Sequence, residues 1–200
     1  MKKRNTGRSV KHGAQALGPE DWLAAAWEAL ARDGEGGVKV ERLAAALGVT
    51  KGSFYWHFAD RSALLSALLE DWERRATALV IEQVDACSES PLERLRALVQ
   101  ATTGAPEAPD VEHAVRAWGA QDAQVRKRLR RVDARREAYV TALLEALGVP
   151  PGQATMRARL LYLALIGEFT WVAHGGPPTD RAAWDELLAR LTSRERKGRG

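Results

Sequence analysis

Polar and aromatic side chains are interleaved in one short segment of the chain, Lys51 to Phe58. If the segment is helical, Phe54 and Phe58 share one face, because residues four apart lie on the same side of a helix. The other faces then carry hydrogen-bonding or charged groups, from Lys51, Ser53, Tyr55, Trp56 and His57. The major groove of DNA admits one helix and presents hydrogen-bond donors, acceptors and thymine methyl groups. These side chains are therefore candidate DNA contacts, with packing against the first helix as the alternative for Trp56.

The residues before this segment predict the turn that positions it. Apolar residues recur at helical spacing from Val40 to Leu47. Gly48 can adopt the left-handed conformation that ends a helix, and Thr50 can cap the next one. The sequence therefore predicts a helix-turn-helix, with a very short second helix from Lys51 to His57.

Several of these residues form a known pattern. They are Gly48-Val49-Thr50, Gly52-Ser53, Tyr55-Trp56-His57-Phe58, Arg61 and Leu64-Leu65. The pattern resembles the DNA-binding signature of the TetR family of transcriptional regulators, the tetracycline-repressor-like proteins, over roughly residues 19 to 72. The resemblance implies that Tyr55 and His57 contact DNA phosphates and that Lys51 and Ser53 reach phosphates or base edges. The candidate DNA-binding set is Lys39, Thr50, Lys51, Gly52, Ser53, Tyr55, Trp56, His57 and Arg61.

Two positions depart from that signature. Arg61 stands where the family usually has Lys, and both cations can hold a phosphate. At the start of the second helix the family commonly has a Thr cap, whereas this chain has Val38-Lys39-Val40-Glu41. We expect Lys39 to supply the phosphate contact by its charge and Glu41 to turn toward Arg42 or solvent.

Basic residues are concentrated at the start of the chain. The 200 residues carry 30 Lys and Arg against 26 Asp and Glu, and the segment before Glu20 has no acid but contains Lys2, Lys3, Arg4, Arg8 and Lys11. We expect residues 1–17 to be a disordered basic arm that follows phosphates or enters a minor groove, or that serves only as a solubilising tail. Residues 18–64 would form the helix-turn-helix domain, residues 65–193 an effector-binding and dimerisation domain, and residues 194–200 a basic tail.

Helical patterns fill the rest of the chain, and no strand pattern is found. Asp60 can cap a long fourth helix whose apolar stripe runs from Leu65 to Val84. Five further helices are expected to begin at about Ser90, Asp110, Asp122, Gln153 and Asp180. The prediction is an all-α fold of about nine helices, with an N-terminal three-helix DNA-binding domain and a helical C-terminal domain.

The penultimate predicted helix is apolar nearly all round from Leu160 to Ile166, which predicts burial on two sides. One side would face its own core and the other a second subunit, and the alternative is a central helix in a monomer. The expected interface comprises Leu160, Leu163, Ala164, Gly167, Trp184, Leu187, Leu188 and Leu191. A two-fold dimer would read two half-sites about 34 Å apart and so predicts a palindromic operator.

The resemblance also implies a small-molecule cavity among the later helices. An apolar pocket with a few polar groups would suit a hydrophobic or aromatic effector. The expected lining residues are Trp72, Gln100, His113, Trp118, Gln121, Tyr139, Tyr162, Glu168, Phe169 and Trp171. The basic run from Arg126 to Arg136 is interpreted as a solvated helix face, with a second DNA contact or an anionic ligand as the alternative.

Other classes of protein receive little support. The four His have no metal-ligand spacing, and the sequence has neither a GxSxG motif nor a phosphate-binding loop. The lone Cys87 suits a reducing cytosol, and no stretch is apolar enough for a membrane span or a signal peptide. We therefore expect a soluble cytoplasmic protein that is not an enzyme and needs no cofactor or metal.

Together these features predict a homodimeric repressor that occupies an operator on double-stranded DNA and is released by a small-molecule effector. The alternative is an architectural or division-linked DNA-binding protein of the same fold, whose effector is a protein. One site near a promoter would favour the repressor, and many dispersed sites would favour the alternative.

Overall fold

A computed structural model of the protein describes residues 17–104 and 108–193, and every regular element in these ranges is a helix. At the N-terminal end lie α1 (Pro19–Asp33), the 3₁₀ turn η1 (Glu35–Gly37), α2 (Val40–Ala46) and α3 (Lys51–Phe54). They are followed by α4 (Arg61–Glu73), the π-helical turn η2 (Arg74–Ala78), α5 (Leu79–Cys87), α6 (Pro91–Thr103), α7 (Ala108–Gln121), α8 (Ala123–Ala146), α9 (Pro151–Ala173) and α10 (Arg181–Thr192).

The elements α4, η2 and α5 form one continuous helix. The residues on either side of η2, Glu73 and Leu79, both have right-handed helical backbone angles. Counted as one, this helix brings the total in the described ranges to nine and confirms the predicted long fourth helix and the all-α fold. The predicted basic arm, apart from Leu17, and the basic tail lie outside the described residues.

Aspartate caps explain where several helices begin. Asp60, Asp122 and Asp180 each accept hydrogen bonds from backbone N–H groups in the first turn that follows, at 2.7 to 3.1 Å. Helix α7 begins at Ala108, two residues before the expected start, so Asp110 lies inside its first turn and does not cap it. Ser90 stands at the N-cap position of α6, but its side chain makes no capping hydrogen bond.

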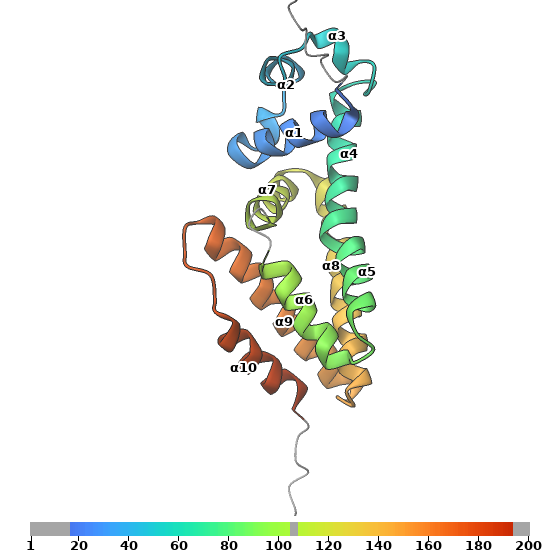
Figure 1. The fold of residues 1–200 in the computed structure, drawn as a ribbon, viewed down its shortest axis with the longest axis vertical. Coiled ribbons are helices and arrows are strands. Elements are labelled where there is room, and N and C mark those ends of the chain that lie inside the picture. Colours follow the sequence, from blue (N-terminus) through green and yellow to red (C-terminus); the bar gives the residue numbers. More distant parts are fainter. Residues whose placement is uncertain (1–16, 105–107, 194–200) are drawn as a thin grey trace, which may run out of the picture.

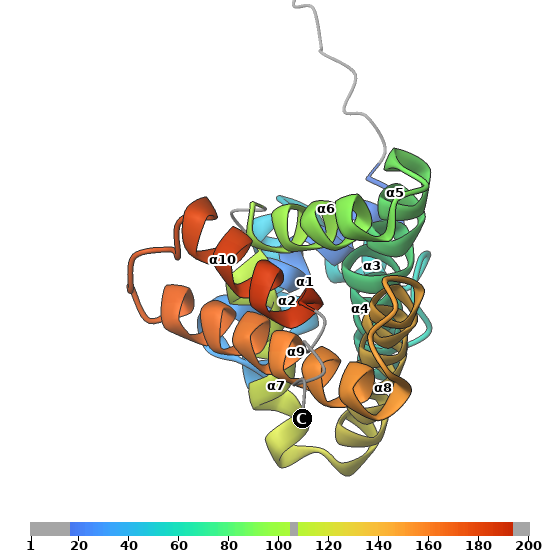
Figure 2. The ribbon, with the colours of Figure 1, turned by 90° about the horizontal axis from the view of Figure 1, so that it is seen from below.

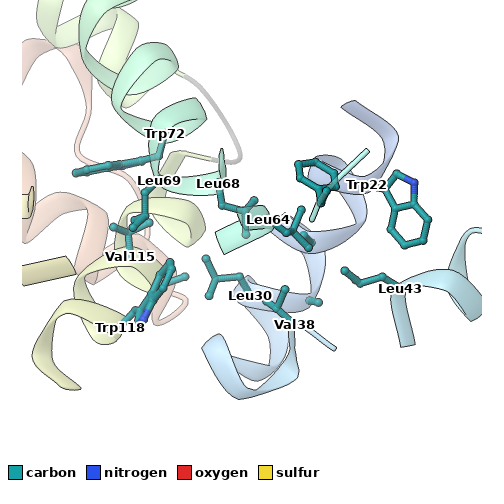
Figure 3. Packing of buried hydrophobic residues seen from close by; sticks show 14 of the residues in the cluster. Trp22, Leu30, Val38, Leu43, Leu64, Leu68, Leu69, Trp72, Val115 and Trp118 are labelled. Carbon is teal, nitrogen blue, oxygen red and sulfur yellow. The ribbon is translucent and has the colours of Figure 1, made fainter. Parts of the chain in front are cut away.

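The hydrophobic core has two parts. One cluster joins α1 to α4 with α7 and α8, and Figure 3 shows it running without a break from Trp22 past Leu30 and Leu68 to Trp72 and Val115. The second cluster is formed by α5, α6, α8, α9 and α10. Because the first cluster continues across the predicted boundary at residue 64, the N-terminal helices are packed firmly on the remainder, while the boundary itself stays a prediction.

The arrangement places the short helices α2 and α3 at one end of the molecule. In Figure 1 the long helix formed by α4, η2 and α5 runs from this end along one side, next to α8, and α7 lies beneath α1. Viewed along the long axis, α6, α9 and α10 complete the bundle (Figure 2). Helix α7 contacts α1, α8 and α9, so it connects the N-terminal helices to the C-terminal ones.

Candidate nucleic-acid interface and internal cavity

The face of α3 that carries Phe54 is buried, as the sequence predicted. Phe54 and Phe58 are 0% and 9% exposed, and the Phe54 ring contacts the edge of Trp22 from α1, with 5.2 Å between ring centroids. The next two side chains point outward, because Tyr55 is 54% exposed and Trp56 is 87% exposed. Packing of Trp56 against the first helix is therefore excluded, and an aromatic pair stands on the surface at the tip of the molecule.

The turn before α3 has the predicted geometry. Gly48 has a φ of +69°, a left-handed conformation that glycine adopts without steric cost. Thr50 occupies the N-cap position, but only its backbone carbonyl takes part, accepting from the amide of Ser53 at 3.0 Å. Helix α3 ends at Phe54, earlier than predicted, and a turn continues to His57. Lys51 and Gly52 are exposed, and Ser53 and His57 are half-buried.

Lys51 is neutralised by an acid on the preceding helix. Its ammonium group forms an ion pair with the carboxylate of Glu41, whose side chain is 65% exposed, so Glu41 turns toward solvent as one of the two expected alternatives and is paired with Lys51 instead of Arg42. The hydrogen bond from Lys51 and its positive charge lower the pKa of Glu41, and the same bond raises the pKa of Lys51. A phosphate that approaches Lys51 would compete directly with Glu41.

Arg61 stabilises the helix-turn-helix through partly buried bonds to the backbone. Its guanidinium donates to the carbonyl of Val38 at 2.5 Å and to the carbonyl of Glu35 at 2.6 Å, and it forms an ion pair with the Glu35 carboxylate. These bonds join the start of α4 to the segment before α2. Most of the Arg61 donors are thus engaged within the protein, and its contact with DNA stays a prediction. Lys39, at the N-cap of α2, is exposed and has no capping bond.

A cavity of about 670 Å³, partly open to solvent, lies between α1 and the C-terminal helices. Its volume falls in the range of small-molecule sites, and most of its wall is apolar. Four of the predicted lining residues do line the cavity, namely Trp72, Tyr139, Tyr162 and Phe169. The other walls come from α1, η2, α5, α6 and α7, including Trp27, Thr77, Ile81, Thr102 and Glu112.

Six predicted lining residues lie elsewhere. Trp118 is part of the hydrophobic core, Gln121 is exposed at the end of α7, and Gln100 lines a separate, smaller pocket beside α10. His113 meets the ring of His174 edge-on, with 4.9 Å between centroids. Glu168 accepts hydrogen bonds from the amide and hydroxyl of Thr179, both at 2.7 Å, and Trp171 donates to the carbonyl of Pro177 at 2.9 Å. Aromatic or polar type alone does not reveal which side of a helix faces the cavity.

A buried ion pair forms one wall of the cavity. The carboxylate of Glu112 accepts from Arg136 at 3.0 Å and from the indole N–H of Trp72 at 3.1 Å, and the Arg136 guanidinium lies over the Trp72 ring at 5.1 Å. Burial alone would raise the pKa of Glu112, but the charges of Arg136 and Arg116 outweigh it and hold that pKa below its ordinary value. Arg136 also donates to the Thr77 hydroxyl at 2.9 Å.

The sequence contained a signal for Arg136 that its position in a basic run concealed. Arg136 lies on the same helical stripe as Val132 and Val140, four residues from each, and both are buried. An arginine within an apolar stripe is a candidate for a buried ion pair. The interpretation of the whole run as a solvated face was therefore wrong at this position.

A second polar cluster joins α7, α8 and α9 behind the cavity. Arg116 donates to Asp133 at 2.9 Å and to the Tyr162 hydroxyl at 2.7 Å, and that hydroxyl donates to Asp133 at 2.5 Å. Burial raises the pKa of the Tyr162 phenol, so it stays protonated. This cluster fixes the orientation of one predicted lining residue.

The predicted dimer residues separate into two groups. On α9, Leu160 and Leu163 are 51% and 55% exposed, and Gly167 is exposed one turn further along. By contrast Trp184, Leu188 and Leu191 of α10 are buried in their own core, while Ala164 and Leu187 are partly buried against it. Since buried side chains have no surface to offer, the α10 part of the predicted interface was wrong for Trp184, Leu188 and Leu191.

In the described part of the chain, no helix is long and apolar enough to cross a membrane. Within the same ranges, no group of three or more His, Cys, Asp or Glu side chains is placed to hold a metal ion.

Comparison with known proteins agrees with this geometry. Residues 23–68 match the family described as bacterial regulatory proteins, tetR family. A TetR transcriptional regulator from Legionella pneumophila has a similar fold, with 15% sequence identity and a TM-score of 0.69 over 88% of this chain and 96% of that chain. A TetR-like transcriptional regulator from Rhodococcus sp. RHA1 is similar too, with 19% identity and a TM-score of 0.69 over 89% of this chain and 95% of that chain. A third similar structure is a TetR-family transcriptional regulator from Agrobacterium tumefaciens, with 21% identity and a TM-score of 0.68 over 87% of this chain and 93% of that chain. No curated protein matches the sequence.

Proposed function

The chain belongs, by its N-terminal domain, to the TetR family of bacterial regulatory proteins, and from this premise we propose that it is a homodimeric repressor released from a palindromic operator by a small molecule. The observation that carries the proposal is the pairing of an exposed recognition surface with a ligand-sized cavity. We call Lys51, Gly52, Ser53, Tyr55, Trp56 and His57 the recognition surface. The cavity lies on the other side of α1 from this surface, in the same compact molecule.

The recognition surface has the chemistry that DNA requires. Lys51 supplies a positive charge, Tyr55 a hydroxyl and Trp56 an exposed apolar ring with an N–H donor. Phosphate contacts position a protein on DNA, and contacts with base edges select the sequence. We assign Tyr55 and His57 to phosphates and the start of α3 to base edges or phosphates.

Dimerisation supplies the second half of the operator contact. A single short helix buries too little surface for tight binding, whereas a two-fold dimer presents two such helices to half-sites about 34 Å apart. The exposed apolar stripe of α9, formed by Met156, Leu160, Leu163, Gly167 and Trp171, supports an interface between identical subunits.

The cavity supports regulation by a ligand. Its wall includes Ala24, Trp27, Glu28 and Ala31 of α1. A bound molecule therefore touches the DNA-binding domain itself as well as α6, α7 and α8. In the proposed mechanism the ligand binds better to a conformation in which the two recognition surfaces are wrongly spaced, and it shifts the protein toward that conformation.

Genome-wide footprinting of the purified protein tests the proposal. We expect one or a few protected palindromes near promoters, with protection lost in the Tyr55→Ala variant. Many dispersed sites would instead favour an architectural or division-linked role with a protein effector. Absence of any specific site at moderate salt would contradict DNA-binding regulation altogether.

A further inference from the structure

Acidic residues outnumber basic residues in the cavity wall. The charged lining residues are Glu28, Asp71, Asp110, Glu112, Arg75 and Arg136. Both cations are already paired, Arg75 with Asp71 at 2.8 Å and Arg136 with Glu112 at 3.0 Å. Glu28 and Asp110 form no ion pair within the described residues. Among the residues that the structure describes, the cavity therefore has two carboxylates without a cationic partner.

Arg136, the buried one of the two paired cations, is poorly placed to receive an anionic ligand. Beyond Glu112, Arg136 donates to the Thr77 hydroxyl and to the carbonyl of Ala76, at 2.9 and 3.2 Å. Its side chain is only 14% exposed. An anion would have to separate the buried Arg136–Glu112 pair and leave the Glu112 carboxylate without its main counter-charge, which is costly in a buried site. Charge thus disfavours an acidic occupant.

Aromatic rings line the same cavity. They belong to Trp27, Trp72, Tyr139, Tyr162 and Phe169. The face of an aromatic ring attracts a cation, most strongly when the contact is shielded from water. Trp72 already carries Arg136 over its face, so the other rings remain for a ligand. An apolar wall, aromatic faces and unpaired carboxylates together fit one chemical class of ligand.

We propose that the cavity binds a hydrophobic organic cation, with its apolar body among the aromatic rings and its positive charge toward Glu28 and Asp110. Both carboxylates are exposed lining residues, so they lie where the cavity opens to solvent. The charged end of the ligand then stays close to water, and only the apolar body is buried. The inference rests on the proposed function only in naming this cation as the effector.

Contact with α1 explains how such a ligand would act. Trp27 donates from its indole nitrogen to Asp71 of α4 at 3.0 Å, and the neighbouring Glu28 is one of the two free carboxylates. A cation at Glu28 would attract the helix that carries Trp27 and contacts α2. The ligand would therefore act on the helix-turn-helix directly.

Three probes of similar shape and different charge test the ligand class. Tetraphenylphosphonium is a cation, triphenylphosphine oxide is neutral and tetraphenylborate is an anion. Isothermal titration calorimetry on the full-length protein should show the tightest binding for tetraphenylphosphonium, weakened by added salt, because charge attraction to exposed carboxylates is screened. Equal or tighter binding of either other probe, or no binding of all three, would overturn the proposal.

Charge-removing variants test the placement of the cation. Glu28→Gln/Asp110→Asn should weaken tetraphenylphosphonium binding by about fivefold and leave triphenylphosphine oxide unchanged, since each rim carboxylate contributes modestly. The matched control Glu89→Gln/Glu145→Gln removes two exposed acids outside the cavity and should bind as wild type does. An equal loss in both double variants would contradict the assigned position.

DNA footprinting without any probe separates this inference from the proposed function. Specific protection of DNA combined with no preference for the cation would refute the ligand class and leave the regulator intact. Selective binding of tetraphenylphosphonium without any specific DNA site would support the cavity and refute the regulator. A shift of operator DNA that is reversed by tetraphenylphosphonium in wild type, but less so in Glu28→Gln/Asp110→Asn, would support both.

Discussion

Two cationic side chains of the helix-turn-helix already have partners within the protein. Lys51 is bound to Glu41 before any phosphate arrives, and Arg61 is bound to Val38 and Glu35. The Lys51–Glu41 pair lies at the surface, where water and salt weaken it, so a phosphate can exchange with Glu41 at low cost. The Arg61 bonds are partly buried and support the fold of the turn instead.

Removing the charge of Glu41 should strengthen DNA binding. In Glu41→Gln, Lys51 no longer has to leave a carboxylate, so operator affinity should rise by about threefold and the dependence of affinity on salt should become steeper. Fluorescence anisotropy with labelled operator DNA at several salt concentrations measures both quantities. Glu89→Gln, an exposed acid outside the recognition surface, is the control. Unchanged affinity in Glu41→Gln would show that Lys51 does not contact DNA.

At the scale of elements, the π turn η2 connects the long helix to the cavity. A π turn interrupts the regular hydrogen-bond ladder of an α-helix and such turns are frequent at functional sites. Here the carbonyl of Ala76 and the hydroxyl of Thr77, which is 1% exposed, both accept from Arg136 of α8. The irregular turn thus presents acceptors to a guanidinium that also pairs with Glu112 of α7. Three helices meet at this one arginine.

Loss of Arg136 should destabilise the fold. The Arg136→Met change leaves the buried Glu112 paired with Arg116, at 2.7 Å, in place of two arginines, which should lower the free energy of unfolding by about 3 kcal/mol, the lower end of the range for a broken buried pair. Urea denaturation followed by circular dichroism measures the loss. In the double variant Arg136→Met/Glu112→Gln the buried charge is gone and much of the stability should return. If the double variant is no more stable than Arg136→Met, the ion pair does not explain the loss.

The stability of the protein should depend on the ionisation of Glu112 in acid. Its folded-state pKa is lower than the ordinary value of 4.5, because Arg136 and Arg116 outweigh the effect of burial. The charged form therefore stabilises the fold above about pH 4.5, and this contribution is lost as the pH falls through the folded-state value. Urea midpoints measured from pH 7 to pH 3 should fall less steeply for Glu112→Gln than for wild type. Parallel curves would contradict the shift.

At the scale of the whole molecule, the described residues include an exposed apolar stripe on α9. Helix α9 exposes Leu160 and Leu163 on the face opposite its buried side, and Met156 and Trp171 extend the stripe in both directions, at 56% and 58% exposure. A row of large apolar side chains at helical spacing is typical of a helix that packs against another one. A second copy of the chain is the partner that the proposed operator symmetry requires.

A charge in this stripe should separate the subunits. Leu163→Glu would place a carboxylate in the apolar centre of the proposed interface, so the dimer should dissociate and operator affinity should fall. Light scattering after size-exclusion chromatography gives the mass in solution. Leu79→Glu is the matched control, because Leu79 is an exposed leucine on α5, 41% exposed and outside the stripe. A Leu163→Glu protein that remains dimeric would refute α9 as the interface.

The helices and the helix-turn-helix were predictable because their causes are local. Gly48 favours the left-handed conformation of the turn, Asp60 caps the long helix, and the spacing of Phe54 and Phe58 assigns them to the core. Such effects act over a few residues and depend little on distant parts of the chain. The all-α fold follows from their sum.

Tertiary structure decided which face of each later helix is buried and which residues that face contacts. Trp184 and Leu163 both stand on apolar stripes, but only the packing of α10 against α6 buries the first, while the second stays exposed on α9. Arg136 resembles its basic neighbours in sequence, and it becomes a cavity residue because Glu112 and Thr77 reach it from other helices. The sequence by itself thus determined the elements and the recognition surface, whose causes are short-range. The cavity, its charges and the free face of α9 depend on contacts between residues far apart in the chain, and only the folded molecule specifies those.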